Sequence, residues 1–412
     1  MKQVTRNFLS LASSEIVRKV LGFLAVAYLA RHLTLADFGL VSLGFTVLSY
    51  TINISSAGLD LFGIRQIAKG ADRDFVGRLV SLRLIIAAAV FVLTAVITSL
   101  IVRDPLTVRI IIIFNCSLFA YALLLEWLYQ GREAMKTVSL GKSVTAAVYL
   151  ALILLLVHSD IDLLWVAVAA VAGDFAMMMF YASKYRREGN SLRPVADLAA
   201  WKQMAGESLP LGVGTVLGQI SANLAPVVLA ILMTNVEVGL YSAASKLVVF
   251  LLLIDRVLGV LLLPASARLQ ASSPAQLSVR LGEAMKWILI AALPICLGGM
   301  LVSKDLIRIV FGENFVAASG LFGILVWFLC FTMIHTVYTS GLVAVAPSNV
   351  YGRVMMIGAV IYTLAVVLLT KFYGLYGTVF GVVVSEGLTL LIARAHLRPH
   401  LRITPVVAVH WI

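Results

Sequence analysis

The residues best suited to chemistry are charged side chains that lie inside long apolar runs. They fall in the first and the eighth run, and they are Glu15, Arg18, Lys19, Lys246, Asp255 and Arg256. A charge at the centre of a bilayer costs about 2.5–3.5 kcal/mol on insertion scales. If these runs cross a membrane, we expect such side chains to line a polar cavity rather than to face lipid.

Simpler structural roles are open to some of these residues. Glu15 and Lys19 are four residues apart, so they can form a salt bridge along one helix, although this pair does not account for Arg18. Asp255 and Arg256 are adjacent and point about 100° apart on a helix. They also lie toward the end of their apolar run, where long side chains can reach water.

The acidic residues deepest in the apolar runs are Asp174 and Glu386. An intramembrane carboxyl group marks either a proton pathway or a partner for a cation. Both interpretations stay open for these two residues and for Asp255 as candidates for ion coupling. Asp60 and Glu126 lie near expected helix ends, where we expect them to be solvated.

Motifs for catalysis or metal binding are missing. Gly141–Ser143 reads GKS, like the end of a phosphate-binding loop, but Lys136 stands where that loop needs glycine. The chain has no HExxH, CxxC or GxSxG, its six histidines are scattered, and its three cysteines fall inside apolar runs. We therefore predict no enzyme activity, no metal and no bound cofactor.

Composition indicates a polytopic membrane protein. Hydrophobic residues make up 61% of the chain and charged residues 13%, against about 25% charged in soluble proteins. Runs of about 17–25 apolar residues can cross a bilayer as helices. Twelve such runs are expected near 9–30, 39–62, 83–102, 108–129, 143–158, 163–183, 208–232, 239–263, 285–303, 318–346, 353–371 and 374–394.

Basic residues give the orientation. Most Lys and Arg residues lie in the segments that share a side with the N-terminus, which predicts that both termini are cytoplasmic. The net charge of +12 is dispersed among short loops, so we expect contact with anionic lipid and no nucleic-acid partner.

Two stretches repeat at an offset of 200 residues: LTLADFGLVS over 33–42 and MTNVEVGLYS over 233–242. They share Thr–x4–Gly–Leu–x–Ser, and coincidence in a biased composition is the alternative explanation. The offset contains six runs, so the repeat predicts two parallel six-helix bundles. Transporters built from repeats place their substrate between the halves.

The same offset matches Glu15 with Thr215 and Lys19 with Gln219, and Asn223 follows at helical spacing. These polar positions predict that equivalent helix faces line one central cavity. We expect a bundle over 1–183, a cytoplasmic connector over 184–206, a second bundle over 207–396 and a cytoplasmic tail over 397–412.

Several stretches, taken in order, resemble a known family. LGFLAVAYLARHLTLADFG, GLDLFGIRQIA, VGLYSAASKL, LLPASARL and IRIVFGENFVAASGLFGIL are similar to the polysaccharide-exporter branch of the multidrug/oligosaccharidyl-lipid/polysaccharide exporter superfamily. That resemblance implies a bacterial inner-membrane flippase with twelve helices. It also implies a substrate of oligosaccharide on undecaprenyl diphosphate, destined for O-antigen, capsule or exopolysaccharide, and as partners a polymerase and a chain-length regulator.

For such a substrate, Arg18, Lys19, Lys246 and Arg256 are the expected contacts of the diphosphate. Thr215, Gln219 and Asn223 are expected to bond sugar hydroxyls. Proton exchange, sodium exchange and consumption of the product are alternative driving forces. Alternative functions are multidrug export, lipid II export, and a non-transporting scaffold of a polysaccharide assembly complex. Lipid II flippases usually carry two further helices, and cationic drugs favour an acidic cavity.

Overall fold

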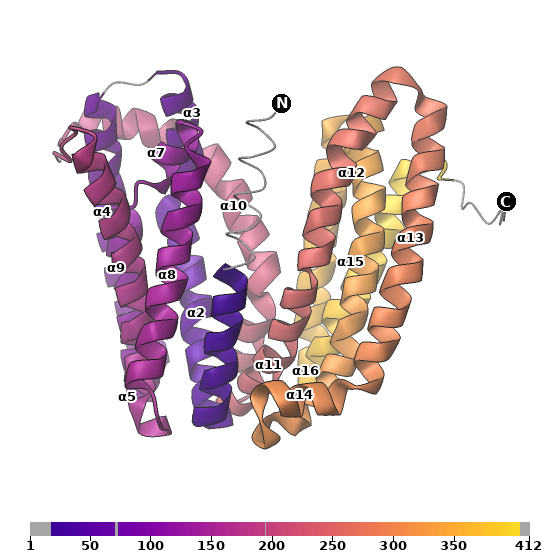
Figure 1. Ribbon diagram of the computed structural model, residues 1–412, viewed down its shortest axis with the longest axis horizontal. Helices are drawn as coiled ribbons and strands as arrows, with labels where there is room; N and C mark the ends of the chain where they lie inside the picture. The colour runs from indigo at the N-terminus through magenta and orange to yellow at the C-terminus, as the bar shows by residue number, and fades with distance from the viewer. Residues whose placement is uncertain (1–17, 71–72, 194, 404–412) are drawn as a thin grey trace. The chain divides into compact units, whose positions relative to one another are not determined.

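The computed structural model describes residues 18–70, 73–193 and 195–403, and within these ranges every regular element is helical. The chain divides into two compact units, Met1–Asn223 and Leu224–Ile412. The division falls inside α10 (Leu198–Leu232), where Asn223 has the non-helical dihedral angles φ −127° and ψ 16°. Figure 1 labels the helices of both units, and each unit is described here by itself.

The first unit is a bundle of long helices interrupted by short ones. Its elements are a helix over 18–32, α2 (Leu35–Ser56), α3 (Leu59–Ala68), α4 (Arg73–Ile101), α5 (Pro105–Asn115), α6 (Ser117–Ala122), α7 (Glu126–Gly131), α8 (Met135–Leu156), the 3-10 turn η1 (Asp160–Asp162), α9 (Leu163–Arg187) and the first part of α10. Within it, α2 packs against α4 and α5, α8 against α9, and α3 against α7.

The expected run 39–62 is two helices in the structure. The chain turns between α2 and α3 at Ala57 and Gly58, whose φ angles are 45° and 78°. Left-handed backbone of this kind is easiest for glycine. At the same turn Gly212 of α10 comes so close that a Cβ on it would lie 2.4 Å from the carbonyl carbon of Ala57. Two glycines therefore allow α10 to pack directly on the turn.

The second unit is organised around one central helix, α15. Its elements are the end of α10, α11 (Asn235–Leu251), α12 (Leu253–Ser272), α13 (Pro274–Leu301), α14 (Ser303–Phe311), the 3-10 turn η2 (Glu313–Ala318), α15 (Ser319–Val345) and α16 (Ser348–Leu397). Helix α15 packs against α16, α13, α12 and α11. It therefore receives side chains from every other long helix of the unit.

Helix α16 is a hairpin of two antiparallel helices. The turn is at Gly374, with φ 61° and ψ −142°. Across it, the hydroxyl oxygens of Thr370 and Thr378 lie 2.8 Å apart, and a Cβ on Gly377 would lie 1.9 Å from the carbonyl oxygen of Leu369. The two arms match the expected runs 353–371 and 374–394.

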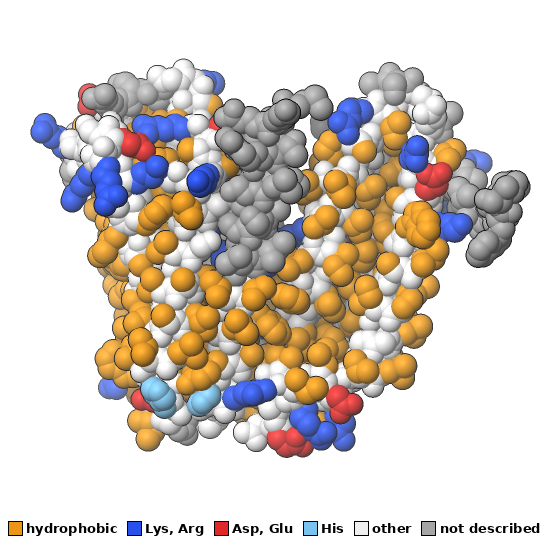
Figure 2. All heavy atoms as spheres, viewed as in Figure 1, with side chains coloured by type: hydrophobic (Ala, Val, Ile, Leu, Met, Phe, Trp, Pro, Cys, Tyr) orange, Lys and Arg blue, Asp and Glu red, His pale blue; other side chains and the backbone are white. Residues whose placement is uncertain are grey.

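The surface of each unit is that of a membrane protein. In the described part of the chain, nine helical segments are long and apolar enough to cross a bilayer, and the α16 hairpin is one of them. Figure 2 shows apolar side chains over the length of the helices, while Lys and Arg gather at the end of the first unit that carries α3 and α7. The all-helical, polytopic class is confirmed, and the count of twelve stays a prediction.

Candidate functional site

The first unit buries a carboxyl group on α9. Asp174 is 6% exposed, and its carboxyl group lies next to the hydroxyl groups of Ser117 and Tyr121 on α6. Arg18, on the helix over 18–32, acts electrostatically on the same tyrosine. The structure therefore brings two of the expected site residues, Arg18 and Asp174, to one polar cluster around Tyr121.

A buried arginine holds the backbone of this cluster in place. Arg83 of α4 donates hydrogen bonds to the carbonyl oxygens of Tyr121 (2.6 Å) and Leu124 (3.2 Å), where the chain breaks between α6 and α7. It also forms a salt bridge of 3.1 Å with Asp60, which accepts a hydrogen bond from Ser56. Helix ends leave carbonyl groups without intrahelical partners, and Arg83 satisfies two of them. The sequence reasoning missed this role.

Glu126 differs from its expected solvated state. Its side chain is 17% exposed and forms a salt bridge of 3.0 Å with Lys142 of α8. Gln130 donates a second hydrogen bond to the same carboxyl oxygen, at 2.5 Å. Glu126 also acts electrostatically on Tyr121, so it belongs to the polar cluster of the first unit. The feature of the sequence that could have indicated a partner for Glu126 is Lys142, a cation just before the expected run 143–158.

The second unit has a polar cluster of its own, made by three helices. His335 Nδ1 lies 2.7 Å from Glu386 Oε1, between α15 and the second arm of α16. The neighbouring Thr336 donates a hydrogen bond of 2.7 Å to Asp255 of α12. Glu386, His335 and Arg256 all act electrostatically on Asp255. The structure thus places Glu386 and Asp255 against two consecutive residues of α15, His335 and Thr336, and sequence reasoning treated His335 as isolated.

The remaining predicted residues are placed as follows. Lys19 is half-buried on the helix over 18–32, Lys246 is half-buried on α11, and Arg256 is exposed on α12. Asn223 is half-buried at the kink of α10. Glu15 and the side chains of Thr215 and Gln219 lie outside the described residues. By exposed surface, Arg18 is half-buried like Lys19 and Lys246.

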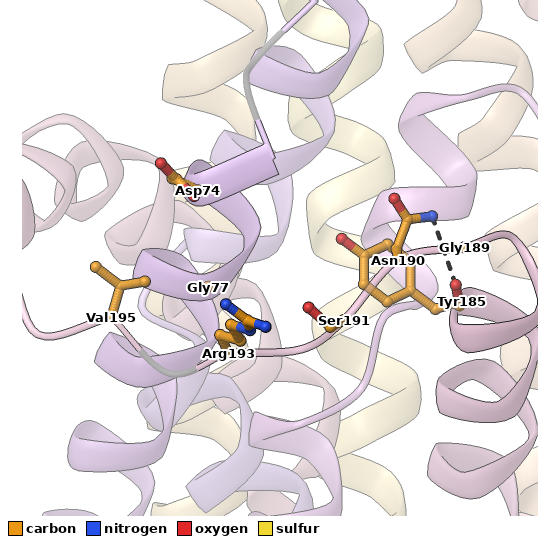
Figure 3. Close-up of a pocket in the computed structure, with 8 residues that line it drawn as sticks. All are labelled: Asp74, Gly77, Tyr185, Gly189, Asn190, Ser191, Arg193 and Val195. Carbon is orange, nitrogen blue, oxygen red and sulfur yellow. Dashed lines mark hydrogen bonds between the residues drawn. The ribbon is translucent and has the colours of Figure 1, made fainter.

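One cavity, of about 210 Å³, opens at the end of the first unit (Figure 3). Its lining consists of Asp74, Gly77, Tyr185, Gly189, Asn190, Ser191, Arg193 and Val195. Asn190 closes the turn after α9 by donating to the carbonyl oxygen of Tyr185 at 3.4 Å. Ligand pockets usually measure about 300–1,000 Å³, so this cavity is too small for a large head group, and none of the predicted site residues lines it.

Comparison of the sequence with known families decides the class of the protein. A family profile described as "Polysaccharide biosynthesis protein" matches residues 4–270. The chain belongs to this family. No protein among those with curated descriptions matches the sequence.

Solved structures share the fold at low sequence identity. "Lipid II flippase MurJ, inward closed conformation" has a TM-score of 0.75 at 13% identity, covering 94% of this chain and 87% of that one. An inward-facing "multidrug resistance MATE family transporter of the MOP superfamily" has a TM-score of 0.71 at 14% identity, covering 93% and 98%. The Vibrio cholerae MATE transporter VcmN has a TM-score of 0.58 at 16% identity, covering 97% and 96%.

The chain thus belongs to a polysaccharide biosynthesis family and has the fold of solved membrane transporters and flippases. The expectation of a multi-pass membrane protein is thereby confirmed. This member of the polysaccharide biosynthesis family carries half-buried cations and, at Asp174, a buried carboxyl group.

Proposed function

We propose that the protein is a flippase that moves undecaprenyl-diphosphate-linked oligosaccharide repeat units from the cytoplasmic to the outer leaflet of the bacterial inner membrane. The observation that carries this proposal is the match to a polysaccharide biosynthesis family in a chain with the fold of MurJ and MATE transporters. The product would serve O-antigen, capsule or exopolysaccharide assembly. A polymerase and a chain-length regulator are the proposed protein partners.

The cationic side chains would bind the diphosphate. A diphosphate cannot cross hydrocarbon without a polar, positively charged route. Arg18 and Lys19 in the first unit and Lys246 and Arg256 in the second are half-buried or exposed rather than sealed in apolar packing. Guanidinium groups fit phosphate oxygens in two-pronged hydrogen bonds. This set of charges is what an anionic head group requires.

The polar side chains would bind the sugars. Asn223 sits at the kink of α10, where the helix departs from regular dihedral angles, and Thr215 and Gln219 precede it on the same helix. We propose that these residues, with Glu15, line the cavity of an alternating-access cycle. The head group would enter from the cytoplasm and leave on the outer side, while the prenyl tail stays in lipid.

The test uses purified protein reconstituted into liposomes of phosphatidylethanolamine and phosphatidylglycerol. The liposomes carry a fluorescent undecaprenyl-diphosphate oligosaccharide, and an impermeant quencher reports the fraction of label on the outer leaflet. We expect protein-dependent access of the quencher to the inner-leaflet label. Liposomes whose inner-leaflet label stays protected, with correctly inserted protein, would contradict the proposal.

Lipid II is the second candidate substrate, because the structural likeness to the lipid II flippase MurJ covers most of both chains. The same assay with fluorescent lipid II separates the two: a preference for lipid II would replace the proposed substrate. Extrusion of ethidium without movement of either lipid would favour a drug exporter. Absence of all three activities, with loss of surface polysaccharide on deletion, would favour a scaffold.

A further inference from the structure

The cavity at the end of the first unit is a small pocket lined mostly by polar side chains. Of its eight lining residues, five carry a polar side chain: Asp74, Tyr185, Asn190, Ser191 and Arg193. Figure 3 shows the hydroxyl groups of Tyr185 and Ser191 on one side of Arg193 and the carboxyl group of Asp74 on the other. Donors and acceptors of hydrogen bonds thus surround one small space.

The segment that follows α9 forms one wall of the pocket and lies directly on α4. The backbone N–H of Val195 donates a hydrogen bond of 3.1 Å to the hydroxyl oxygen of Ser81. A Cβ on Gly77 would lie 2.4 Å from the carbonyl oxygen of Arg193, so the segment can approach α4 this closely only over a glycine. A hydrogen bond and close packing therefore hold this wall in place.

Three side chains of the lining can bind a ligand. In the part of the chain that the structure describes, the side chains of Asp74, Ser191 and Arg193 form no hydrogen bond and no ion pair with the protein. All three residues are exposed, so a ligand can reach them and replace the water around them. Arg78, one turn further along α4, instead pairs with Asp197 at 3.8 Å.

The charges of the lining cancel, which favours a neutral ligand. Asp74 brings one negative charge and Arg193 one positive charge, and no other lining residue is charged. A phosphate group bound to Arg193 would share the pocket with the carboxylate of Asp74, and like charges repel at short distance. A ligand hydroxyl can both donate to a carboxylate and accept from a guanidinium group. A sugar residue carries several hydroxyl groups on one ring and so suits both sides of the pocket.

The volume of the pocket limits the ligand to one sugar residue. The cavity measures about 210 Å³, which corresponds to about seven water molecules at about 30 Å³ each. A single sugar ring with its hydroxyl groups fits such a space, whereas an oligosaccharide does not. The remainder of a longer head group would stay outside the opening.

We propose that this pocket binds one neutral sugar residue, with the Asp74 carboxylate accepting hydrogen bonds from its hydroxyl groups and with Arg193 and Ser191 donating to them. The segment after α9 is the expected cytoplasmic connector, so the pocket lies on the side from which the proposed head group would enter. A sugar held there would keep a lipid-linked repeat unit at the first unit before transport. Sugar binding rests on the pocket alone, and its part in transport rests on the proposed flippase function.

The first test measures sugar binding without transport. Full-length protein in phosphatidylcholine nanodiscs is studied by saturation-transfer difference NMR with the methyl glycosides of glucose, galactose, mannose and N-acetylglucosamine. We expect at least one of them to bind with a Kd of about 1–10 mM. Asp74→Ala and Arg193→Ala should each weaken this binding by at least about tenfold, because each removes hydrogen bonds to a charged group. Ser191→Trp should abolish it, because the indole at this exposed position fills the pocket.

The matched controls are Arg187→Ala and Glu207→Ala, which remove exposed charges of the first unit outside the lining. Both should leave the Kd unchanged. Raising the salt from about 0.05 M to about 0.5 M should also leave it unchanged, because the ligand is neutral. The proposal is overturned if none of the glycosides binds, or if Ser191→Trp binds them as well as the wild type does. Equal binding of glycerol, or binding of inorganic phosphate in place of the glycosides, would overturn it too.

The second test measures the use of the pocket in the flipping assay. Asp74→Ala and Arg193→Ala should raise the mole fraction of lipid-linked oligosaccharide that gives half the maximal rate by at least about fivefold. A methyl glycoside that binds should slow the wild type and not Ser191→Trp. If these variants flip the lipid as the wild type does, the pocket has no part in transport while the flippase function stands. If the wild type does not flip the lipid, the proposed function fails while the NMR result still decides sugar binding.

Discussion

Thr34 and Thr234, 200 residues apart, form the same structure in the two units. Each is the residue before a helix, α2 or α11, and its side chain accepts a hydrogen bond from a backbone N–H of the first turn. Each hydroxyl also donates to the acidic residue three positions later, Asp37 or Glu237. The repeated sequence motif is therefore a repeated helix cap.

The helices before the two caps also match in their environments. Ala25 and Ala225 are both completely buried, and Leu29 and Leu229 are at most 1% exposed. Identities among apolar residues are weak evidence in a chain of this composition, but identical residues in identical states of burial are stronger. This agreement supports the prediction that the two halves are structural repeats.

The matched caps predict matched losses of stability. Thr34→Ala and Thr234→Ala should each lower the free energy of unfolding by about 1 kcal/mol, as expected when a threonine N-cap is removed. The measurement is denaturant unfolding in detergent, with Ser183→Ala, an exposed serine of α9, as control. Two cap variants that unfold like this control would show that the caps carry no stability.

The α16 hairpin predicts a sharp contrast between two of its glycines. Gly377→Ala should lower the free energy of unfolding by on the order of 3 kcal/mol, because the new Cβ would lie 1.9 Å from the carbonyl oxygen of Leu369. Gly352→Ala is the matched control, since nothing lies within 4 Å of its Cβ position. It should be neutral or stabilising by up to about 1 kcal/mol. Equal behaviour of the two variants in thermal unfolding would rule out this close approach.

The sequence predicted the helices well where length and hydropathy decide the structure. The expected runs 143–158 and 163–183 correspond to α8 and α9. Helix α8 begins earlier and α9 ends later than expected, because polar residues at these ends stay helical. The run 108–129 is instead broken into α5, α6 and α7. Neither Cys116 nor Leu123 is a helix breaker, so local propensity gave no warning. Arg83, far away in sequence, supplies the donors that make the second break tolerable.

The polar clusters were predictable only in part. The depth of Asp174 and Glu386 in apolar runs could be read from the sequence, and both residues lie in polar clusters. Their partners could not be read, because His335 and Glu386 are 51 residues apart and meet only through the packing of α15 on α16. A scattered histidine in an apolar run was the single available signal.

The partners of Arg83, two backbone carbonyl groups and the Asp60 carboxylate, should contribute unequally to the free energy of unfolding. Arg83→Met should lower the free energy of unfolding by on the order of 3 kcal/mol, because it leaves two carbonyl groups without donors. Asp60→Asn should lower it by less than about 1 kcal/mol, because the Asp60 side chain is 42% exposed and Arg83 keeps its bonds to Tyr121 and Leu124. Thermal and denaturant unfolding in detergent measure both.

If Arg83→Met and Asp60→Asn lower the free energy of unfolding equally, Arg83 stabilises the protein through its ion pair rather than through its bonds to the carbonyl groups. The double variant separates the cases further. If the carbonyl bonds dominate, Arg83→Met with Asp60→Asn should be as unstable as Arg83→Met alone. If the ion pair dominates, removing both charges should restore part of the loss.

The cationic residues predict a defect in transport without a defect in folding. Arg18→Ala/Lys19→Ala, and separately Lys246→Ala, should lower the rate of flipping by at least about tenfold, since a hydrogen bond to a charged group contributes about 1.5–3 kcal/mol. Lys19→Arg and Lys246→Arg keep the charge and should retain most of the rate. The flipping assay and the amount of surface polysaccharide in cells are the two readouts, each normalised to protein in the membrane.

Arg280→Ala is the matched control for these variants, because Arg280 is a cation of the second unit with a 69% exposed side chain that pairs with Glu283. Its loss should change neither readout. Normal membrane levels with undiminished polysaccharide in both alanine variants would remove Arg18, Lys19 and Lys246 from the mechanism. Lower membrane levels with a normal rate per molecule would instead assign these charges to insertion and folding, because each correctly inserted molecule would then still move the head group at the normal rate.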